Sequence, residues 1–247
     1  MRLLFILLFS TSLFALISIV PVEVGEKPGF SGKVGASLST KRGNSDTDSY
    51  KAALRLTYDN NVSYVAWSEL SGEYGEANNV KNVQKIYLHF RYIHNLQDKF
   101  NVIETFAQSQ EDEFKLIDKR RLIGGGYRKR FFKNLIPLKF YIGVGGMYEY
   151  ISYTSSTDPT ENNVRANIYA AFTYPYEKRF DFSITSYYQP RVDCFSDFVT
   201  ANKLELKIYI LDEMYLNFRI SYDYDARPAI GVKKEDFSQD TAFVYEF

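Results

Sequence analysis

Residues 164–174 read VRANIYAAFTY, and this stretch decides the fold class. Apolar side chains occupy every second position from Val164 to Tyr174, and most of the positions between them, including Arg165, Asn167 and Thr173, are polar. A period of two is typical of a β-strand with two different faces, whereas a helix repeats every ~3.6 residues. The stretch therefore predicts a strand.

The same alternation recurs along the chain from Phe30 onward and predicts about twelve strands. Their ranges are 29–40, 49–58, 62–74, 83–94, 100–109, 119–132, 138–151, 164–174, 180–189, 198–210, 214–224 and 237–247. Two segments are irregular, which leaves ten strands as the alternative: both faces of 62–74 carry apolar residues, and Phe106 shares the face of Glu104 and Gln108. Most segments reach the ~9–11 residues that a tilted strand needs to cross a bilayer, against about five or six in globular proteins.

Long strands at a sheet edge leave backbone groups unpaired, and in lipid only closure of the sheet satisfies them. The pattern predicts an all-β fold, a closed antiparallel transmembrane β-barrel. Alternation alone does not say which face points outward. Aromatic residues at the predicted strand ends favour the membrane, because Tyr and Phe gather where lipid meets water.

The connections also differ in length. Those at 41–48, 75–82, 110–118, 152–163, 190–197 and 225–236 are long, and those at 59–61, 95–99, 133–137, 175–179 and 211–213 are short. Long outer loops that alternate with short periplasmic turns are typical of outer-membrane barrels. The alternation predicts that both termini lie in the periplasm.

The two ends of the chain indicate export. Residues 1–20 hold Arg2 and then an uncharged run, which predicts a signal peptide, with an uncleaved anchor as the alternative. A short segment, 21–28, precedes the barrel domain, 29–247. The chain ends in FVYEF, and a terminal aromatic residue such as Phe247 resembles the signal read by the barrel-assembly machinery.

The composition excludes some classes of function. Lys plus Arg is 30 and Asp plus Glu is 30, so there is no basic excess to bind nucleic acid. The chain has 21 Tyr and 20 Phe but one Trp, a balance that suits an interfacial surface. The single cysteine, Cys194, excludes a disulfide scaffold.

Three stretches resemble the YdiY-like family of salt-stress-induced outer-membrane proteins. They are the Gly-containing strand 32–39 followed by KRGNS at 41–45, the Arg-then-Gly-rich run DKRRLIGGGY at 118–127, and the apolar stretch 143–150. The resemblance covers residues 29–247. It implies an outer-membrane barrel and carries no catalytic residues.

The chain offers little for catalysis or metal binding. His89 shares a face with Lys85 and Arg91, and His94 lies near a predicted periplasmic turn. Neither histidine has the surroundings of an outer-membrane phospholipase or protease. No Cys and His cluster, P-loop or dinucleotide motif occurs, so no metal site, cofactor or catalytic residue is predicted.

The ionic face is therefore the candidate functional site. Nineteen residues are predicted to line the lumen: Lys33, Lys51, Arg55, Glu69, Lys85, His89, Arg91, Glu104, Arg128, Arg130, Lys139, Glu149, Arg165, Asp181, Lys203, Glu205, Arg219, Asp223 and Asp240. Mixed charges could border a narrow aqueous path or pair across the lumen and plug it.

We expect a non-enzymatic outer-membrane protein, either a narrow channel or a structural or stress-response component of the envelope. Its expected partners are outer-membrane lipid, lipopolysaccharide and the assembly machinery. Two alternatives stand beside it: an outer-membrane lipid-modifying or hydrolytic enzyme, and a soluble periplasmic barrel that binds an apolar ligand.

Overall fold

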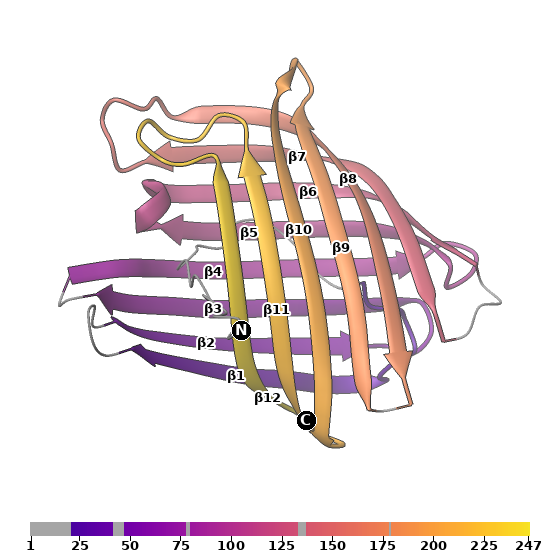
Figure 1. Ribbon diagram of the computed structural model, residues 1–247. Helices are drawn as coiled ribbons and strands as arrows, with labels where there is room; N and C mark the ends of the chain where they lie inside the picture. The colour runs from indigo at the N-terminus through magenta and orange to yellow at the C-terminus, as the bar shows by residue number, and fades with distance from the viewer. Residues whose placement is uncertain (1–20, 42–46, 78–79, 133–136, 178) are drawn as a thin grey trace, which may run out of the picture.

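The computed structural model describes residues 21–41, 47–77, 80–132, 137–177 and 179–247, and shows one closed antiparallel barrel (Figure 1). Its strands are β1 (Gly29–Lys41), β2 (Thr47–Asp59), β3 (Tyr64–Ala77), β4 (Val80–Asn95), β5 (Asn101–Asp112), β6 (Ile117–Phe131), β7 (Lys139–Tyr153), β8 (Glu161–Tyr176), β9 (Phe180–Arg191), β10 (Cys194–Leu211), β11 (Met214–Asp225) and β12 (Glu235–Glu246). Each strand pairs with its neighbours in sequence, and β12 pairs with β1.

Twelve strands confirm the predicted barrel, and the alternative of ten is wrong. The predicted signal peptide, 1–20, and most of the turn that supports the family resemblance, 42–46, lie outside the described residues. A three-residue 3-10 helix, η1 (Glu113–Lys115), follows β5. Among the described residues, no helix has the length and apolar character that a membrane-spanning helix requires.

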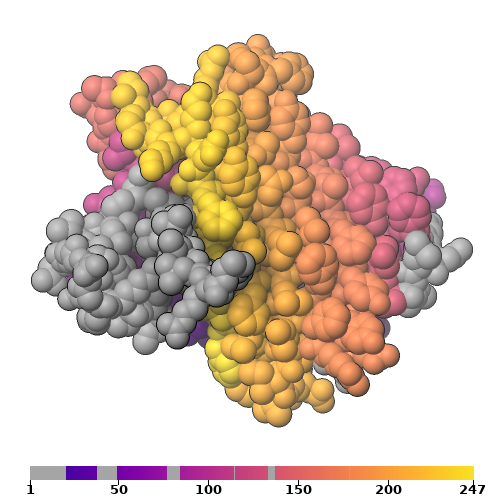
Figure 2. Space-filling view, in the orientation of Figure 1, coloured from indigo at the N-terminus to yellow at the C-terminus, as the bar shows by residue number. Residues whose placement is uncertain are grey.

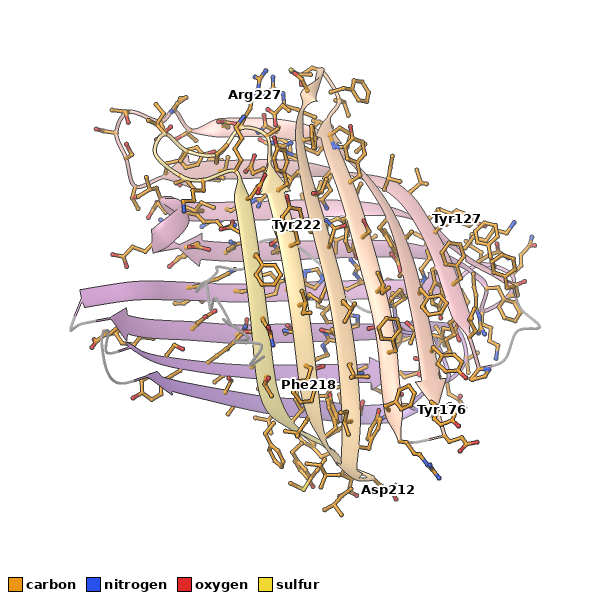
Figure 3. The ribbon with its side chains drawn as sticks, viewed as in Figure 1. Tyr127, Tyr176, Asp212, Phe218, Tyr222 and Arg227 are labelled. Carbon is orange, nitrogen blue, oxygen red and sulfur yellow. The ribbon has the colours of Figure 1, made fainter. Side chains whose placement is uncertain are left out.

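The two faces of the strands are oriented as in a membrane barrel, with the apolar face outside and the ionic face inside. Large apolar side chains that are exposed on the outer surface include Leu54, Leu56, Ile86, Leu88, Phe90, Ile123, Val144, Val164, Ile168, Ile184, Ile208 and Ile220. On β11, Phe218 and Tyr222 project outward (Figure 3). A soluble barrel would expose its ionic face instead, because a large exposed apolar surface promotes association. The orientation therefore argues against the soluble alternative.

We call the end of the barrel where β1 begins and β12 finishes the terminal end, and the opposite end the distal end. A row of rings follows the terminal end: Phe30 contacts Tyr58 at 4.7 Å between centroids, Tyr58 contacts Tyr64 at 6.0 Å, and Tyr64 contacts Tyr92 at 5.5 Å. Such a row is typical of an aromatic girdle at a membrane interface. Tyr127 and Tyr176 also lie toward this end (Figure 3).

The expected contrast between long and short connections is wrong in part. The connection predicted at 190–197 shrinks to residues 192–193, because β9 runs to Arg191 and β10 begins at Cys194. β6 ends at Phe131 and β7 begins at Lys139, on either side of the connection predicted at 133–137. Polar residues that look like loop in sequence continue the strand ladder, since backbone pairing does not depend on side-chain polarity. Loop length therefore does not orient the barrel, and periplasmic termini stay a prediction.

The seam between β1 and β12 is much shorter than the other strand pairings. Four register pairs join these strands, from Lys33 with Glu246 to Ala36 with Phe243, whereas thirteen join β1 to β2. Beyond them the strands diverge (Figure 1). The C-terminal residue completes the seam: Phe247 and Gly32 exchange two backbone hydrogen bonds, of 2.6 and 2.9 Å. The Phe247 ring occupies the place that a Cβ at Gly32 would fill.

Inward-facing glycines in β6 and β7 make room for rings from neighbouring strands. A Cβ at Gly143 would lie 2.1 Å from the Tyr169 ring, and a Cβ at Gly124 would lie 2.6 Å from the tip of Phe106. These glycines therefore let large side chains pack against the inner wall.

Gly143→Ala should destabilise the barrel by about 1–3 kcal/mol, because the new methyl group has to displace the packed Tyr169 ring. Gly72→Ala is the matched control, since nothing lies within 4 Å of a Cβ built there. The measurement is the urea midpoint of the folded band on unboiled gels. Equal midpoints for the two variants would contradict this packing.

Candidate functional site: the barrel interior

All nineteen residues predicted for the lumen lie on the inner face, buried or half-buried. The structure divides them between two regions. Lys85, His89, Arg91, Glu104, Arg128, Arg130, Lys139, Glu149 and Arg165 lie on β4 to β8, where the interior is packed. Lys33, Lys51, Arg55, Glu69, Asp181, Lys203, Glu205, Arg219, Asp223 and Asp240 lie on β1 to β3 and β9 to β12, where it is more open.

In the packed half, one carboxylate holds two guanidinium groups. Glu104 lies 3.5 Å from Arg91 Nη1 and 2.8 Å from Arg128 Nη1. The Tyr169 hydroxyl, two strands beyond β6, donates to Glu104 at 2.6 Å. The four side chains together bridge β4, β5, β6 and β8. They close this part of the interior by pairing rather than bordering a water path.

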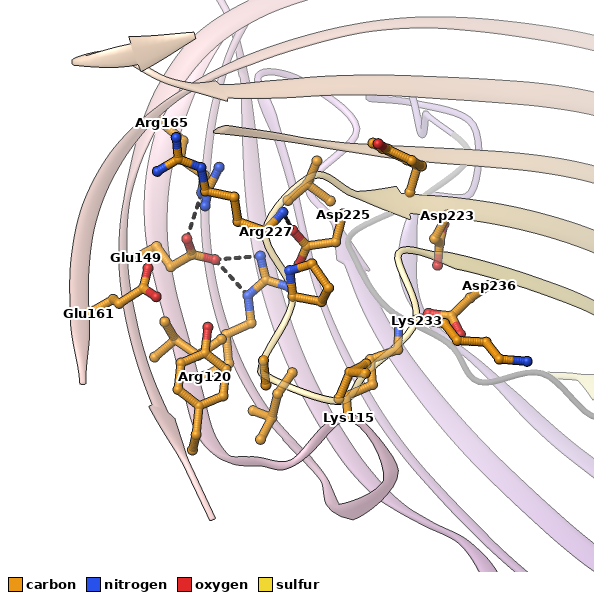
Figure 4. A pocket seen from close by; sticks show the side chains of 18 residues that line it. Lys115, Arg120, Glu149, Glu161, Arg165, Asp223, Asp225, Arg227, Lys233 and Asp236 are labelled. Carbon is orange, nitrogen blue, oxygen red and sulfur yellow. Dashed lines mark hydrogen bonds and ion pairs between the residues drawn. The ribbon is translucent and has the colours of Figure 1, made fainter. Parts of the chain in front are cut away.

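A second ionic network lies nearer the distal end. Glu149 accepts from Arg120 Nε at 2.7 Å and from Arg165 Nε at 2.6 Å (Figure 4). Arg165 also pairs with Asp197 at 3.0 Å. Arg120 and Asp197 are missing from the sequence-based set. Arg120 lies in the Arg-then-Gly-rich run 118–127. Asp197 falls in the predicted connection 190–197, but in the structure it belongs to β10.

The connection between β11 and β12 lies over this network. Ala229 is buried, and the Ile230 amide donates to Asp158 in the connection between β7 and β8 at 3.1 Å. A cavity of about 40 Å³ remains beneath, lined partly by Arg120, Glu149 and Arg165. Figure 4 shows how Asp225 and Arg227 approach from the loop side.

Between the ionic networks the interior is apolar, which the sequence analysis did not predict. Trp67, Phe106, Leu122 and Met147 form one buried cluster. A second contains Tyr141, Tyr169 and Tyr187, with the Tyr169 and Tyr187 rings stacked at 4.9 Å. The sequence did hold a signal. The apolar residues that disturbed the alternation in 62–74 and 100–109 include Trp67 and Phe106, which face inward.

The two histidines lie in different surroundings. His89 is fully buried, with its ring 4.8 Å from that of Trp67. His94 lies at the terminal end and shares a 3.3 Å hydrogen bond with Tyr92. In the described parts of the chain, no group of three His, Cys, Asp or Glu side chains could hold a metal ion.

The N-terminal segment 21–28 enters the barrel at the terminal end, and we call it the strap. Its Val24 packs with Val65, Ile93 and Val102 on the inner wall. Its Glu23 is 5 % exposed and accepts hydrogen bonds from Arg130 at 3.0 Å.

Further polar contacts fix the strap. The Tyr141 hydroxyl donates to Glu23 at 2.8 Å, and Lys139 lies 3.5 Å from the same carboxylate. The Gly25 amide donates to Asp59 at 2.8 Å. Burial raises the pKa of Glu23, but Lys139, the Tyr141 hydroxyl and Arg130 outweigh burial, so the pKa lies below its ordinary value.

The open half contains a cavity of about 150 Å³ between the walls β1–β3 and β10–β12. Its lining residues are Lys33, Gly35, Lys51, Ala53, Arg55, Glu69, Ser71, Lys203, Glu205, Lys207, Tyr215, Asn217, Arg219 and Val244. Arg55 stacks over Trp67, 4.3 Å from the ring centroid, and so separates the cavity from the packed half. On the outside, β10 to β12 form a continuous wall (Figure 2).

Comparison with known proteins supports the fold. The family model described as "Protein of unknown function, DUF481" matches residues 34–247, which confirms the family resemblance drawn from the sequence. No curated protein matches the chain significantly.

Solved barrels resemble the chain at low identity. An outer membrane channel from Pseudomonas putida F1 aligns with a TM-score of 0.58 and 13 % identity, covering 93 % of this chain and 100 % of the channel. The translocator domain of autotransporter NalP from Neisseria meningitidis gives 0.52 and 11 %, covering 90 % of each chain. The NanC porin gives 0.50 and 12 %, covering 87 % and 97 %. At this identity the likeness shows the fold alone.

Glu149→Ala should destabilise the barrel by about 3–5 kcal/mol, because it leaves two buried guanidinium groups without their shared carboxylate. Asp193→Ala is the control: Asp193 also pairs with an arginine, at 2.6 Å, but is 70 % exposed, so its loss should have little effect. Urea midpoints would compare them. Similar shifts would show that the Glu149 network does not stabilise the barrel.

Proposed function

We propose that the chain, which belongs to the family described as "Protein of unknown function, DUF481", is a narrow non-enzymatic channel of the bacterial outer membrane. The observation that carries the proposal is the cavity of about 150 Å³ lined by charged side chains inside a barrel whose outer face is apolar. Water and ions require such an interior, and lipid requires such an exterior.

The outer surface supports the membrane location. Strands of 12 to 18 residues exceed the length that crosses a bilayer, and their exposed faces carry Leu, Ile, Val and Phe. Outer-membrane lipid and lipopolysaccharide are the proposed partners of this face. Phe247, at the exposed end of the seam, is the proposed contact for the assembly machinery.

The path we propose is off-centre. The half formed by β4 to β8 is filled by the Glu104 and Glu149 networks and by the two apolar clusters, so a solute has no route there. The remaining route follows the cavity between β1–β3 and β10–β12. A path bordered by one half of a twelve-stranded barrel is narrow, which suits small solutes.

The strap restricts the terminal end of this path. It is held by Glu23 and Val24 against β3 to β7, and its Lys27 pairs with Glu246 on β12. These contacts extend across the opening at the terminal end of the barrel, from β3–β7 to β12. Release of the strap would widen the mouth without any change in the barrel wall.

The purified protein should conduct ions in planar bilayers, and the double variant E23Q/V24N should conduct more. Loss of a buried ion pair costs about 3–5 kcal/mol, enough to shift strap release more than about a hundredfold. The variant E213Q/V62N makes the same chemical changes at exposed residues of the same end and should match the wild type. Absence of conductance in all three proteins would refute the channel.

Strap attachment should weaken in acid. The lowered pKa of Glu23 means that the attached strap favours the ionised carboxylate, so this stabilisation is present above the ordinary value of 4.5 and is lost as the pH falls through the lowered value. Arg130, Lys139 and Tyr141 face Glu23, and Glu26 on the strap also pairs with Lys139. Conductance should therefore rise below about pH 4.5 in the wild type.

The E23Q variant is the control for this pH dependence, because glutamine does not titrate. Its conductance should be high at neutral pH and change little in acid. A wild type and an E23Q variant with the same pH profile would show that Glu23 does not govern the strap.

A further inference from the structure

The cavity in the open half has an uneven distribution of charge. Six of its lining side chains are cationic, Lys33, Lys51, Arg55, Lys203, Lys207 and Arg219, and two are anionic, Glu69 and Glu205. The cations come from both walls, with three on β1 and β2 and three on β10 and β11. A solute in the cavity is therefore surrounded by positive groups on opposite sides.

The two anionic residues are already neutralised by the arginines. Arg55 Nε donates to Glu69 at 2.8 Å, and Arg219 Nε donates to Glu205 at 2.6 Å. A guanidinium and a carboxylate in direct contact cancel much of each other's charge. The other cationic side chains of the lining are four lysines, Lys33, Lys51, Lys203 and Lys207, each of which has interactions of its own.

The carboxylates that face three of these lysines lie outside the cavity lining and are distant or shared. Lys207 lies 3.7 Å from Asp181, which also accepts from the Tyr209 hydroxyl at 2.7 Å. Lys33 lies 3.0 Å from Glu246, which also pairs with Lys27 of the strap.

Lys51 completes this set. It lies 3.7 Å from Asp240 and 3.9 Å from Glu73. The lining of the cavity itself therefore holds more cationic than anionic side chains.

Two of the lysines lie near the same aromatic ring. Lys33 Nζ lies 6.0 Å from the centroid of the Tyr215 ring, and Lys207 Nζ lies 5.5 Å from the same centroid. One aromatic ring thus holds an ammonium group from β1 and another from β10. Like charges repel each other, and an anion between the two ammonium groups would be attracted to both.

We infer that this cavity is a binding site for small anions that carry phosphate or carboxylate groups, and that the channel conducts such anions in preference to cations. The inference rests on the proposed channel function and names its solute class. Lysine suits this task because its ammonium is a compact charge with three donors that can turn toward a ligand of any geometry.

The size of the cavity limits the solute. A volume of about 150 Å³ has room for several water molecules. Inorganic phosphate or a short dicarboxylate fits such a space.

The test measures reversal potentials across a potassium chloride gradient for the full-length protein. The wild type should be anion-selective, and K33Q/K207Q should lower the ratio of anion to cation permeability about tenfold, which corresponds to ~1.4 kcal/mol for two charges next to the path. The matched control, K119Q/K129Q, removes two lysines that are exposed on the outer face and should retain the wild-type ratio.

A second measurement identifies the anion class. At constant ionic strength, inorganic phosphate and succinate should each reduce the chloride current of the wild type in a saturable manner, and more weakly in K33Q/K207Q. The more effective of the two anions shows whether the site prefers phosphate or carboxylate groups.

The outcomes separate the two proposals. Conductance without anion preference, or without block by either anion, overturns the anion site and leaves the channel standing. Anion preference that K119Q/K129Q reduces as much as K33Q/K207Q also overturns the site, because surface charge would then explain the selectivity. Absence of conductance in the wild type and in E23Q/V24N overturns the channel, and the anion site with it.

Discussion

The barrel depends on one constraint, that backbone N–H and C=O groups in hydrocarbon must find partners within the protein. Twelve strands meet it by pairing in a ring, and all other features follow from that ring. The alternating side chains must then divide between lipid and interior, so the outer face is apolar. The charged residues that face the interior meet one another there, where pairing offsets the cost of leaving water.

The inward-facing residues pack differently in the two halves of the barrel. Beneath β4 to β8, Glu104 and Glu149 are each shared by two arginines, and aromatic rings that pack against glycines fill the space between the two networks. Beneath β1 to β3 and β10 to β12, small side chains such as Gly35, Ala53 and Ser71 leave room, and lysines take the place of rings. One half of the interior is therefore packed, and the other half contains the larger described cavity. A path through the barrel would lie in this second half.

The sequence predicts the fold well because the two-residue period records directly which side chains face lipid. It also places the ionic residues on one face, since residues such as Arg165 and Glu205 alternate with apolar neighbours. It does not reveal which ionic residues meet. Glu104 contacts Tyr169, and Lys51 contacts Asp240, because the sheet curves into a closed barrel and brings distant strands face to face. A local sequence pattern does not show such contacts. The contacts of the strap were not predicted, because its eight residues show no hydrophobic periodicity. Trp67 and Phe106, which interrupt the alternation, face inward and pack in the interior.

The short pairing of β1 with β12 also has a consequence for the assembly of the barrel. Each of the other strand pairs joins neighbours in sequence and can form as a hairpin while the chain is still open. The closing pair joins Lys33 to Glu246, residues separated by almost the whole polypeptide, so it forms only after the hairpins have brought its two strands together. Until then both outermost strands present bare hydrogen-bonding edges. Docking of the final phenylalanine on Gly32 is the event that brings this vulnerable stage to an end.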